Sequence, residues 1–303
     1  MKIGSLGIST LFLLLAGCGG AGQSITATPP PPPPPATPFP LKATASFDAI
    51  SSLMSYNEPA SANASFNTLG LQGRGAVTFS YDAASGTYTV QGGGVTASFG
   101  QGNQIPDTSY NDTFSNTNGA VTDAVKLYGN ARSDTPGTPP VVLTYTSFGI
   151  WTHTDSATAQ TTKTYFLYGQ PTGAASMPTT GSASYQMTAE AHMFPGGMTA
   201  SERITGTATL NANFGNGLVD TVLKFGSTYA GSGTISGDQF AGDFATNDPT
   251  ALNGKFSGGF FGPGAKEAGF TFQIHVHNAD PYAGATILPQ DVYIAGAAAG
   301  PKG

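Results

Sequence analysis

The feature that most constrains the fold is a series of short segments in the second half of the chain, in which apolar and polar side chains alternate between turn residues. In Phe270-Thr-Phe-Gln-Ile-His-Val-His277, the apolar side chains fall on one face of an extended strand and the polar ones on the other. The apolar face is predicted to fill a core, and the polar face to meet water or a partner. A closed antiparallel barrel is therefore expected, since closure removes the unpaired edges of a sheet. The eight predicted strands are residues 182–189, 201–214, 218–225, 231–235, 239–244, 254–261, 270–277 and 291–295.

The first half of the chain also alternates between strand-like and turn-like segments, although less regularly. Residues 100–120 are polar and are predicted to form a loop. Residues 169–181 are rich in proline, glycine and threonine, which indicates a domain boundary. Upstream of that boundary, the predicted strands are residues 75–81, 87–91, 141–153 and 162–169.

The composition excludes some classes of partner and favours strands over helices. Charged residues make up 9% of the chain and the formal net charge is −6, and no basic patch is present, so nucleic acid is excluded as a partner. The chain has 42 glycines and abundant threonine, serine and asparagine, which is typical of strands joined by tight turns. These properties predict an all-β protein.

The N-terminal residues have the pattern of a lipoprotein export signal. Lys2 precedes an apolar run, residues 6–16, that is too short for the roughly 20 residues a membrane-spanning helix needs. The run ends in Leu15-Ala-Gly-Cys18, which matches the lipobox recognised by lipoprotein signal peptidase. Residues 1–17 are therefore predicted to be a signal peptide, and Cys18, the only cysteine of the chain, to carry the lipid.

The residues after the cysteine are predicted to tether the folded part to a membrane. Gly19 stands where an aspartate would favour retention in the inner membrane, so outer-membrane placement is expected. Residues 18–41 contain an unbroken proline run, Pro29 to Pro35, which favours an extended polyproline II spacer. The protein is expected at the cell surface, and the periplasmic face is the alternative that the sequence leaves open.

One segment between two predicted strands resembles a known family signature. Residues 258–272 read Gly-Gly-Phe-Phe-Gly-Pro-Gly-Ala-Lys-Glu-Ala-Gly-Phe-Thr-Phe, which is similar to the C-terminal barrel signature of transferrin-binding protein B and its relatives. Ala268 and Phe270 depart from the family pattern, and the resemblance covers residues 165–303 well. The matching positions are Phe260, Phe261, Gly262, Pro263, Ala265, Glu267, Gly269 and Phe272.

The resemblance implies a two-part architecture and a binding role. It implies a handle-like β domain at residues 42–172, followed by an eight-stranded antiparallel barrel at residues 173–303. Relatives include surface lipoproteins that bind transferrin, factor H, or haem and haemoglobin. Their ligands differ because their loops differ, so the fold does not assign a ligand here.

No combination of residues predicts catalysis, and the chain is expected not to be an enzyme. Glu267 has no partner carboxylate for acid–base work, so a structural role is expected, in which it forms hydrogen bonds within the turn between two strands. The aromatic residues Tyr145, Phe148 and Trp151 are interpreted as core rather than as a binding surface.

The histidines are the candidates for a metal, and a histidine or a tyrosine could ligate haem. His275 and His277 lie two residues apart on one strand face and could share a metal, but a third ligand is needed and nothing places Asp280 suitably. They remain weak candidates, and no metal is assigned. Haem ligation by these two, by His153 or by His192 is chemically possible, yet no spacing selects one of them, so no cofactor is predicted.

The sequence therefore predicts an outer-membrane-anchored, non-enzymatic binding module for an iron- or haem-bearing protein or a similar nutrient ligand. An outer-membrane receptor is a possible further partner. The alternative is a structural envelope lipoprotein without a soluble ligand. A third hypothesis, an enzyme with a dispersed site, would require hydrolase activity that a single substitution abolishes.

Overall fold

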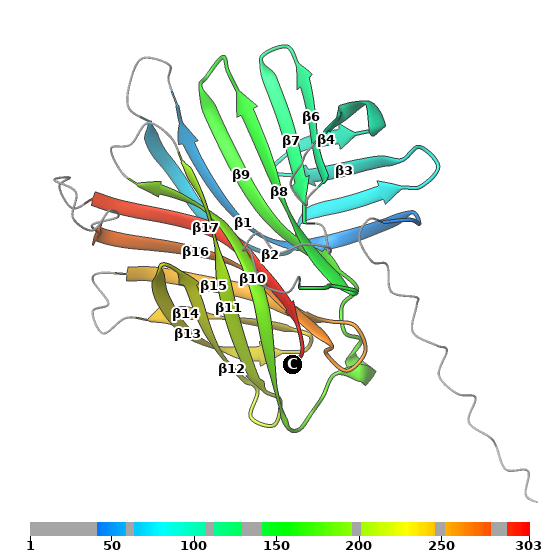
Figure 1. Ribbon diagram of the computed structural model, residues 1–303, viewed down its shortest axis with the longest axis vertical. Coiled ribbons are helices and arrows are strands. Elements are labelled where there is room, and N and C mark those ends of the chain that lie inside the picture. The colour runs from blue at the N-terminus through cyan, green and yellow to red at the C-terminus, as the bar shows by residue number, and fades with distance from the viewer. Residues whose placement is uncertain are drawn as a thin grey trace, which may run out of the picture. The chain divides into compact units, whose positions relative to one another are not determined.

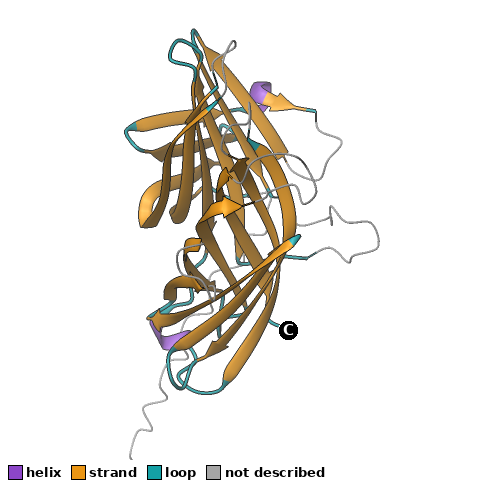
Figure 2. Ribbon diagram, turned by 90° about the vertical axis from the view of Figure 1, so that its left-hand side faces the viewer, coloured by secondary structure: helices purple, strands orange, loops and turns teal. Residues whose placement is uncertain are grey.

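The computed structural model describes residues 41–58, 64–106, 112–128, 141–195, 201–245, 252–279 and 290–303. Most of these residues lie in strands, and Gln101–Asn103 and Ala174–Ser176 form short 3-10 helices, drawn in purple in Figure 2. In this part of the chain no helix reaches the length and apolar character needed to span a bilayer. The predicted signal peptide, Cys18 and most of the proline-rich tether lie outside the described residues.

The first half of the chain forms one antiparallel sheet of nine strands, in the order β4-β3-β2-β1-β9-β8-β7-β6-β5 (Figure 1). β1 and β9 are neighbours in the middle of the sheet, because β1 to β4 follow one another to one edge and β5 to β9 return from the other edge. The strands are β1 (Ala45–Asn57), β2 (Ser65–Asp82), β3 (Thr87–Gly92), β4 (Val95–Phe99), β5 (Gln104–Ile105), β6 (Asp112–Asn118), β7 (Val121–Leu127), β8 (Thr146–Asp155) and β9 (Gln160–Gly169).

The second half forms a closed antiparallel barrel of eight strands, in which β10 pairs with both β11 and β17. All eight strands predicted from the sequence are confirmed, as is the all-β class with a β domain before the barrel. The strands are β10 (Ser182–Pro195), β11 (Glu202–Asn213), β12 (Leu218–Phe225), β13 (Ser227–Ser236), β14 (Gln239–Ala245), β15 (Leu252–Phe261), β16 (Glu267–Ala279) and β17 (Gln290–Pro301).

Aromatic side chains fill the barrel interior, because strand alternation sends every second residue inward. Phe256, Phe260, Phe270 and Phe272 are fully buried there. Outward positions on β10 to β14 carry mostly serine, threonine, asparagine and small residues, and most are exposed. The predicted apolar face of residues 270–277 is thus confirmed as an inner face.

The polar face of the same strand, expected to meet water or a partner, is only partly open to water. Thr271 is fully buried, because β1, β2 and β9 of the sheet contact β16. His275, nearer the end of the strand, is 22% exposed. The partner that covers part of this face is therefore the protein's own sheet.

The last strand is longer than predicted, because it continues through an alanine- and glycine-rich run to Pro301. Alanine and glycine have low strand propensity, so the sequence pattern ended the strand at Ala295. In the structure, Ala297 and Ala299 pack against the sheet while Ala298 packs inside the barrel. Small side chains on both faces let the sheet and the barrel approach closely.

Two predictions in the first half are wrong. Residues 100–120, expected to be a loop, include the strand β6, whose Phe114 is buried in the core of the sheet. Residues 141–153 were expected to form one strand, but β8 begins only at Thr146. The backbone N–H groups of residues 144–146 donate to a carboxylate of the barrel, which explains why pairing in the sheet starts late.

Candidate binding surfaces

The carboxylate of Glu267 connects the barrel to the sheet. Glu267 begins β16 and is 3% exposed. Its Oε1 accepts a hydrogen bond from the N–H of Thr144 at 2.6 Å, and its Oε2 accepts from Tyr145 and Thr146 at 2.8 and 2.9 Å. Burial raises the pKa of this carboxyl above its usual value, and the three N–H donors oppose that shift. The sequence predicted hydrogen bonds within the turn, but these three bonds reach the sheet.

The signature residues lie where the barrel meets the sheet. Gly262 has a φ of +72°, and a Cβ there would come within 2.5 Å of the Tyr145 ring. A Cβ at Gly269 would come within 2.6 Å of Leu167 on β9. Pro263 is partly exposed in the turn. The remaining signature side chains are buried, in the barrel interior or at its junction with the sheet: Phe260, Phe261, Ala265 and Phe272.

A buried tyrosine–histidine pair lies at the same junction. The Tyr165 hydroxyl, fully buried on β9, is 2.6 Å from Nδ1 of His192 on β10. Burial, reinforced by the positive charges of Lys163, Arg203 and Lys126, lowers the pKa of His192 to about 2. His192 therefore stays neutral in the folded protein and acts as a fixed hydrogen-bonding partner between the two halves.

This neutral histidine predicts acid sensitivity. An unfolded chain protonates histidine near pH 6.5, whereas folded His192 does so only near pH 2, so protons favour the unfolded state between these values. Its stabilising contribution is present above pH 6.5 and is lost as the pH falls. Between pH 7 and pH 5, the free energy of unfolding of the wild type is expected to fall by about 1–2 kcal/mol more than that of the His192→Gln variant. Thermal denaturation followed by circular dichroism at both pH values measures this difference. An equal loss of stability in the two proteins would contradict the prediction.

A small hollow opens on the sheet beside its single tryptophan. Its volume is about 140 Å³. Trp151 is 4% exposed and donates from Nε1 to Oδ1 of Asp123 at 2.8 Å, and Nδ1 of His153 lies 2.8 Å from the same oxygen. The core interpretation of Trp151 and Phe148 is confirmed by their burial. The residues that line the hollow are Leu53, Gln72, Val77, Gly92, Gly93, Val95, Trp151, His153, Thr162 and Thr164.

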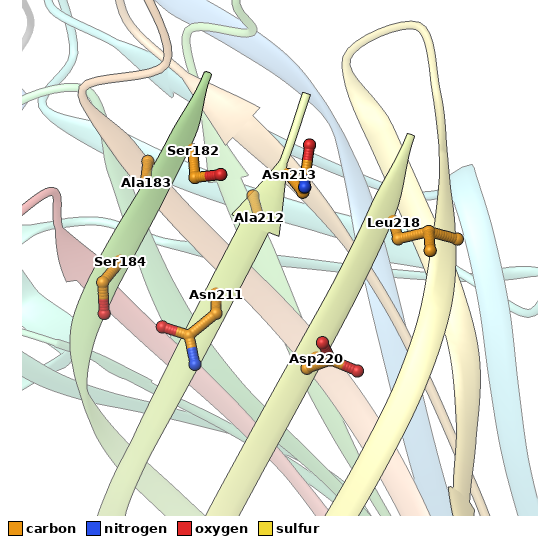
Figure 3. Close-up of a pocket in the computed structure, with 8 residues that line it drawn as sticks. All are labelled: Ser182, Ala183, Ser184, Asn211, Ala212, Asn213, Leu218 and Asp220. Atoms are coloured by element: carbon orange, nitrogen blue, oxygen red, sulfur yellow. The ribbon is translucent and has the colours of Figure 1, made fainter. Parts of the chain in front are cut away.

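A shallow groove lined by polar and apolar side chains lies on the outside of the barrel, across β10, β11 and β12 (Figure 3). Its volume is about 280 Å³. Ser184 pairs in register with Asn211, and Asn211 pairs with Asp220, so their side chains form one row on the outer face. A second row is formed by Ser182, Asn213 and Leu218. The groove offers hydrogen-bond donors, acceptors and one carboxylate at the surface.

The two predicted metal candidates meet a third residue that the sequence did not identify. His275 and His277 lie on β16, and Asp291 lies on β17 beside them. Oδ2 of Asp291 is 3.1 Å from Nε2 of His275 and 3.7 Å from Nδ1 of His277. Asp280, the acid considered from its nearness in sequence, lies outside the described residues. The pairing of the last two strands was the signal that could have identified Asp291.

The fold defines a class of protein: a closed eight-stranded antiparallel barrel preceded by a nine-stranded sheet. More narrowly, residues 177–287 match a family model described as the C-lobe and N-lobe β-barrels of transferrin (Tf)-binding protein B. The resemblance read from residues 258–272 is thereby confirmed for the barrel. A search of curated proteins found no match.

Solved structures with a similar arrangement are distant in sequence. Intact Ap-TbpB (N and C lobes) is 13% identical, with 89% of this chain and 79% of that chain covered and a TM-score of 0.43. The haemoglobin receptor HpuA from Kingella denitrificans is 15% identical, with coverages of 89% and 90% and a TM-score of 0.41. Transferrin binding protein B from Haemophilus parasuis Hp5 is 13% identical, with coverages of 87% and 77% and a TM-score of 0.43. At this distance the likenesses carry no argument about a ligand.

Proposed function

We propose that this chain is a non-enzymatic binding protein, anchored to the outer membrane through a lipid on Cys18, that takes an iron- or haem-bearing protein as its partner. The observation that carries the proposal is the match of the barrel to the transferrin-binding protein B barrels. The lipobox and the proline-rich tether support display at a distance from the membrane. An envelope protein without a soluble ligand is the alternative.

Two hollows on the described part of the chain are small for a ligand such as haem. The hollow on the sheet, at about 140 Å³, and the groove on the barrel, at about 280 Å³, are both smaller than the roughly 300–1,000 Å³ of typical small-molecule pockets. The groove is shallow and lined by both polar and apolar side chains, which suits a protein–protein contact. Asp220 at its edge is the charged group that such a partner would meet.

The attachment of the sheet to the barrel also suits a binding role. Glu267, the Tyr165–His192 pair, and the hydrogen bond of 3.0 Å from the Ser52 hydroxyl to the Gly296 carbonyl all join the two halves. Rigid, preorganised surfaces lose less conformational entropy when a partner binds. We infer that the two halves present one fixed surface.

The first step of the test asks where the protein lies. Intact cells are treated with a protease, and the mature protein is expected to be digested while a periplasmic control survives. Cys18→Ala should remain unlipidated and leave the membrane fraction. Protection of the wild-type protein, or an acylated Cys18→Ala variant, would contradict the proposed location or anchor.

The second step asks what it binds. Purified lipoprotein in detergent is immobilised and exposed separately to transferrin, haemoglobin and free haem, and binding of one of the two proteins is expected. Asp220→Lys should weaken that binding at least about tenfold, since like or mismatched charges at a contact are costly. Glu202→Lys is the matched control, because Glu202 is exposed at the opposite end of β11. Binding of haem alone, or of nothing, would overturn the protein-partner proposal and favour a small ligand or an envelope role.

A further inference from the structure

We propose that His275, His277 and Asp291 form a binding site for one divalent transition-metal ion of the Zn²⁺, Ni²⁺ or Cu²⁺ class. The site lies at the end of the β16–β17 pair, and it is independent of the protein-binding function proposed above. A ligand atom from each of the three side chains lies within 4.8 Å of the other two. Two strands therefore bring together three groups of the kind that bind metals.

The distances are those of a site that needs little rearrangement. Two ligand atoms bound to one tetrahedral Zn²⁺ at about 2.0–2.1 Å lie about 3.4 Å from each other. The separations from Oδ2 of Asp291, 3.1 Å to His275 and 3.7 Å to His277, lie on either side of that value. The two imidazole rings are also close, with centroids 3.9 Å apart. A metal could be bound by small side-chain rotations alone.

A local irregularity of the sheet brings these groups together. Val276 pairs with Val292, but the next recorded pair is Ala279 with Gln290, so β16 carries one extra residue over this stretch. Such bulges redirect side chains and are frequent next to functional sites. His277 lies within the bulged stretch, next to the β17 residue that supplies the carboxylate.

Aromatic stacking fixes the orientation of the first imidazole. The Tyr293 ring stacks on His275 at 4.4 Å between centroids, with 18° between their planes. Phe66, from β2 of the sheet, stacks in turn on Tyr293 at 3.6 Å and 3°. A ligand whose ring orientation is fixed before the metal arrives loses less entropy on binding. A side chain of the sheet therefore helps to orient a metal site whose three ligands come from strands of the barrel.

The donor set selects the class of ion. Two imidazoles and one carboxylate suit borderline ions such as Zn²⁺, Ni²⁺ and Cu²⁺, whereas Mg²⁺ and Ca²⁺ prefer oxygen ligands. The side chains of His275, His277 and Asp291 are 22%, 39% and 39% exposed, so an ion can enter from solvent. Three protein ligands leave at least one coordination position for water or for a group of a bound partner.

The test uses the full lipoprotein, purified in detergent with a tag that contains no histidine and freed of metal with a chelator. Isothermal titration with ZnCl₂ is expected to show one bound ion per chain. His277→Gln and Asp291→Asn should each weaken binding at least about tenfold, because even the loss of a residue that only orients a metal ligand costs about 10–100-fold. Co²⁺ in place of Zn²⁺ should give visible absorption bands that disappear in His277→Gln.

The matched control is His153→Gln. His153 is 26% exposed and lies 2.8 Å from Asp123, so it forms a histidine–carboxylate pair with no third ligand among the described residues. This variant should bind Zn²⁺ as the wild type does. Circular dichroism verifies that each variant is folded. The proposal is overturned if the wild type shows no stoichiometric binding, or if His275→Gln/His277→Gln binds as tightly as the wild type.

Discussion

Replacing Glu267 by alanine is expected to lower the free energy of unfolding by about 3–5 kcal/mol. Three backbone N–H groups, those of Thr144, Tyr145 and Thr146, would lose their acceptor. Each buried donor left without a partner costs about 1–3 kcal/mol. Part of this loss is offset, because the variant no longer buries a carboxylate. Burial disfavours the charged form of that carboxylate and so raises its pKa. The melting temperature should fall by about 10 °C.

Thermal denaturation of the purified lipoprotein, followed by circular dichroism, measures the effect. Glu267→Gln should lose about 1–3 kcal/mol, because one amide oxygen can replace Oε2 for two of the donors while the amide NH₂ faces the third. Asp243→Ala is the matched control: Asp243 forms an exposed ion pair with Lys255 and should change stability by less than about 0.5 kcal/mol. If all three variants melted together, Glu267 would not join the two halves.

The barrel was predictable because local patterns determine it. Alternating side chains and turn residues are properties of neighbouring positions, and β12, β14 and β16 were located by them within three residues at each end. The part of β17 after Ala295 was missed, because alanine has a low strand propensity. Its alanines fit there because the barrel and the sheet pack closely, which a local sequence pattern does not show. β6 was also missed, because all its residues except the buried Phe114 are polar and therefore look like a loop.

Only some residues of the candidate sites could be predicted from the sequence, since each site also depends on contacts between distant segments. His275 and His277 were found from their spacing on one strand, but Asp291 is contributed by the pairing register of the next strand and by a bulge. Glu267 was predicted to form hydrogen bonds within its turn, yet its partners lie more than 120 residues earlier in the chain. Spacing reveals which residues share a face, and pairing across strands reveals which of them meet.

Alanine substitutions in the signature turn are expected to distinguish two reasons for its glycines. One is the positive φ angle, and the other is the space left for a neighbouring aromatic ring. Gly262 and Gly264 both have positive φ, +72° and +67°. A Cβ at Gly262 would lie 2.5 Å from the Tyr145 ring, whereas a Cβ at Gly264 would meet nothing within 4 Å. Gly264→Ala should therefore cost only the backbone penalty, about 1–2 kcal/mol. Gly262→Ala should cost about 1–3 kcal/mol more, because the aromatic ring must move.

Equilibrium denaturation of the two variants gives this difference, and the same pair in a Tyr145→Ala background explains it. Without the ring, the two alanine substitutions should cost the same, so the double-mutant coupling energy isolates the contact between turn and sheet. Equal costs in the wild-type background would mean that the turn needs glycine only for its dihedral angles. An excess that disappears with Tyr145→Ala would mean that part of the barrel signature reflects the surface the barrel must present to its sheet. A barrel signature of this kind would then identify the docked pair of β domains, and not the barrel alone.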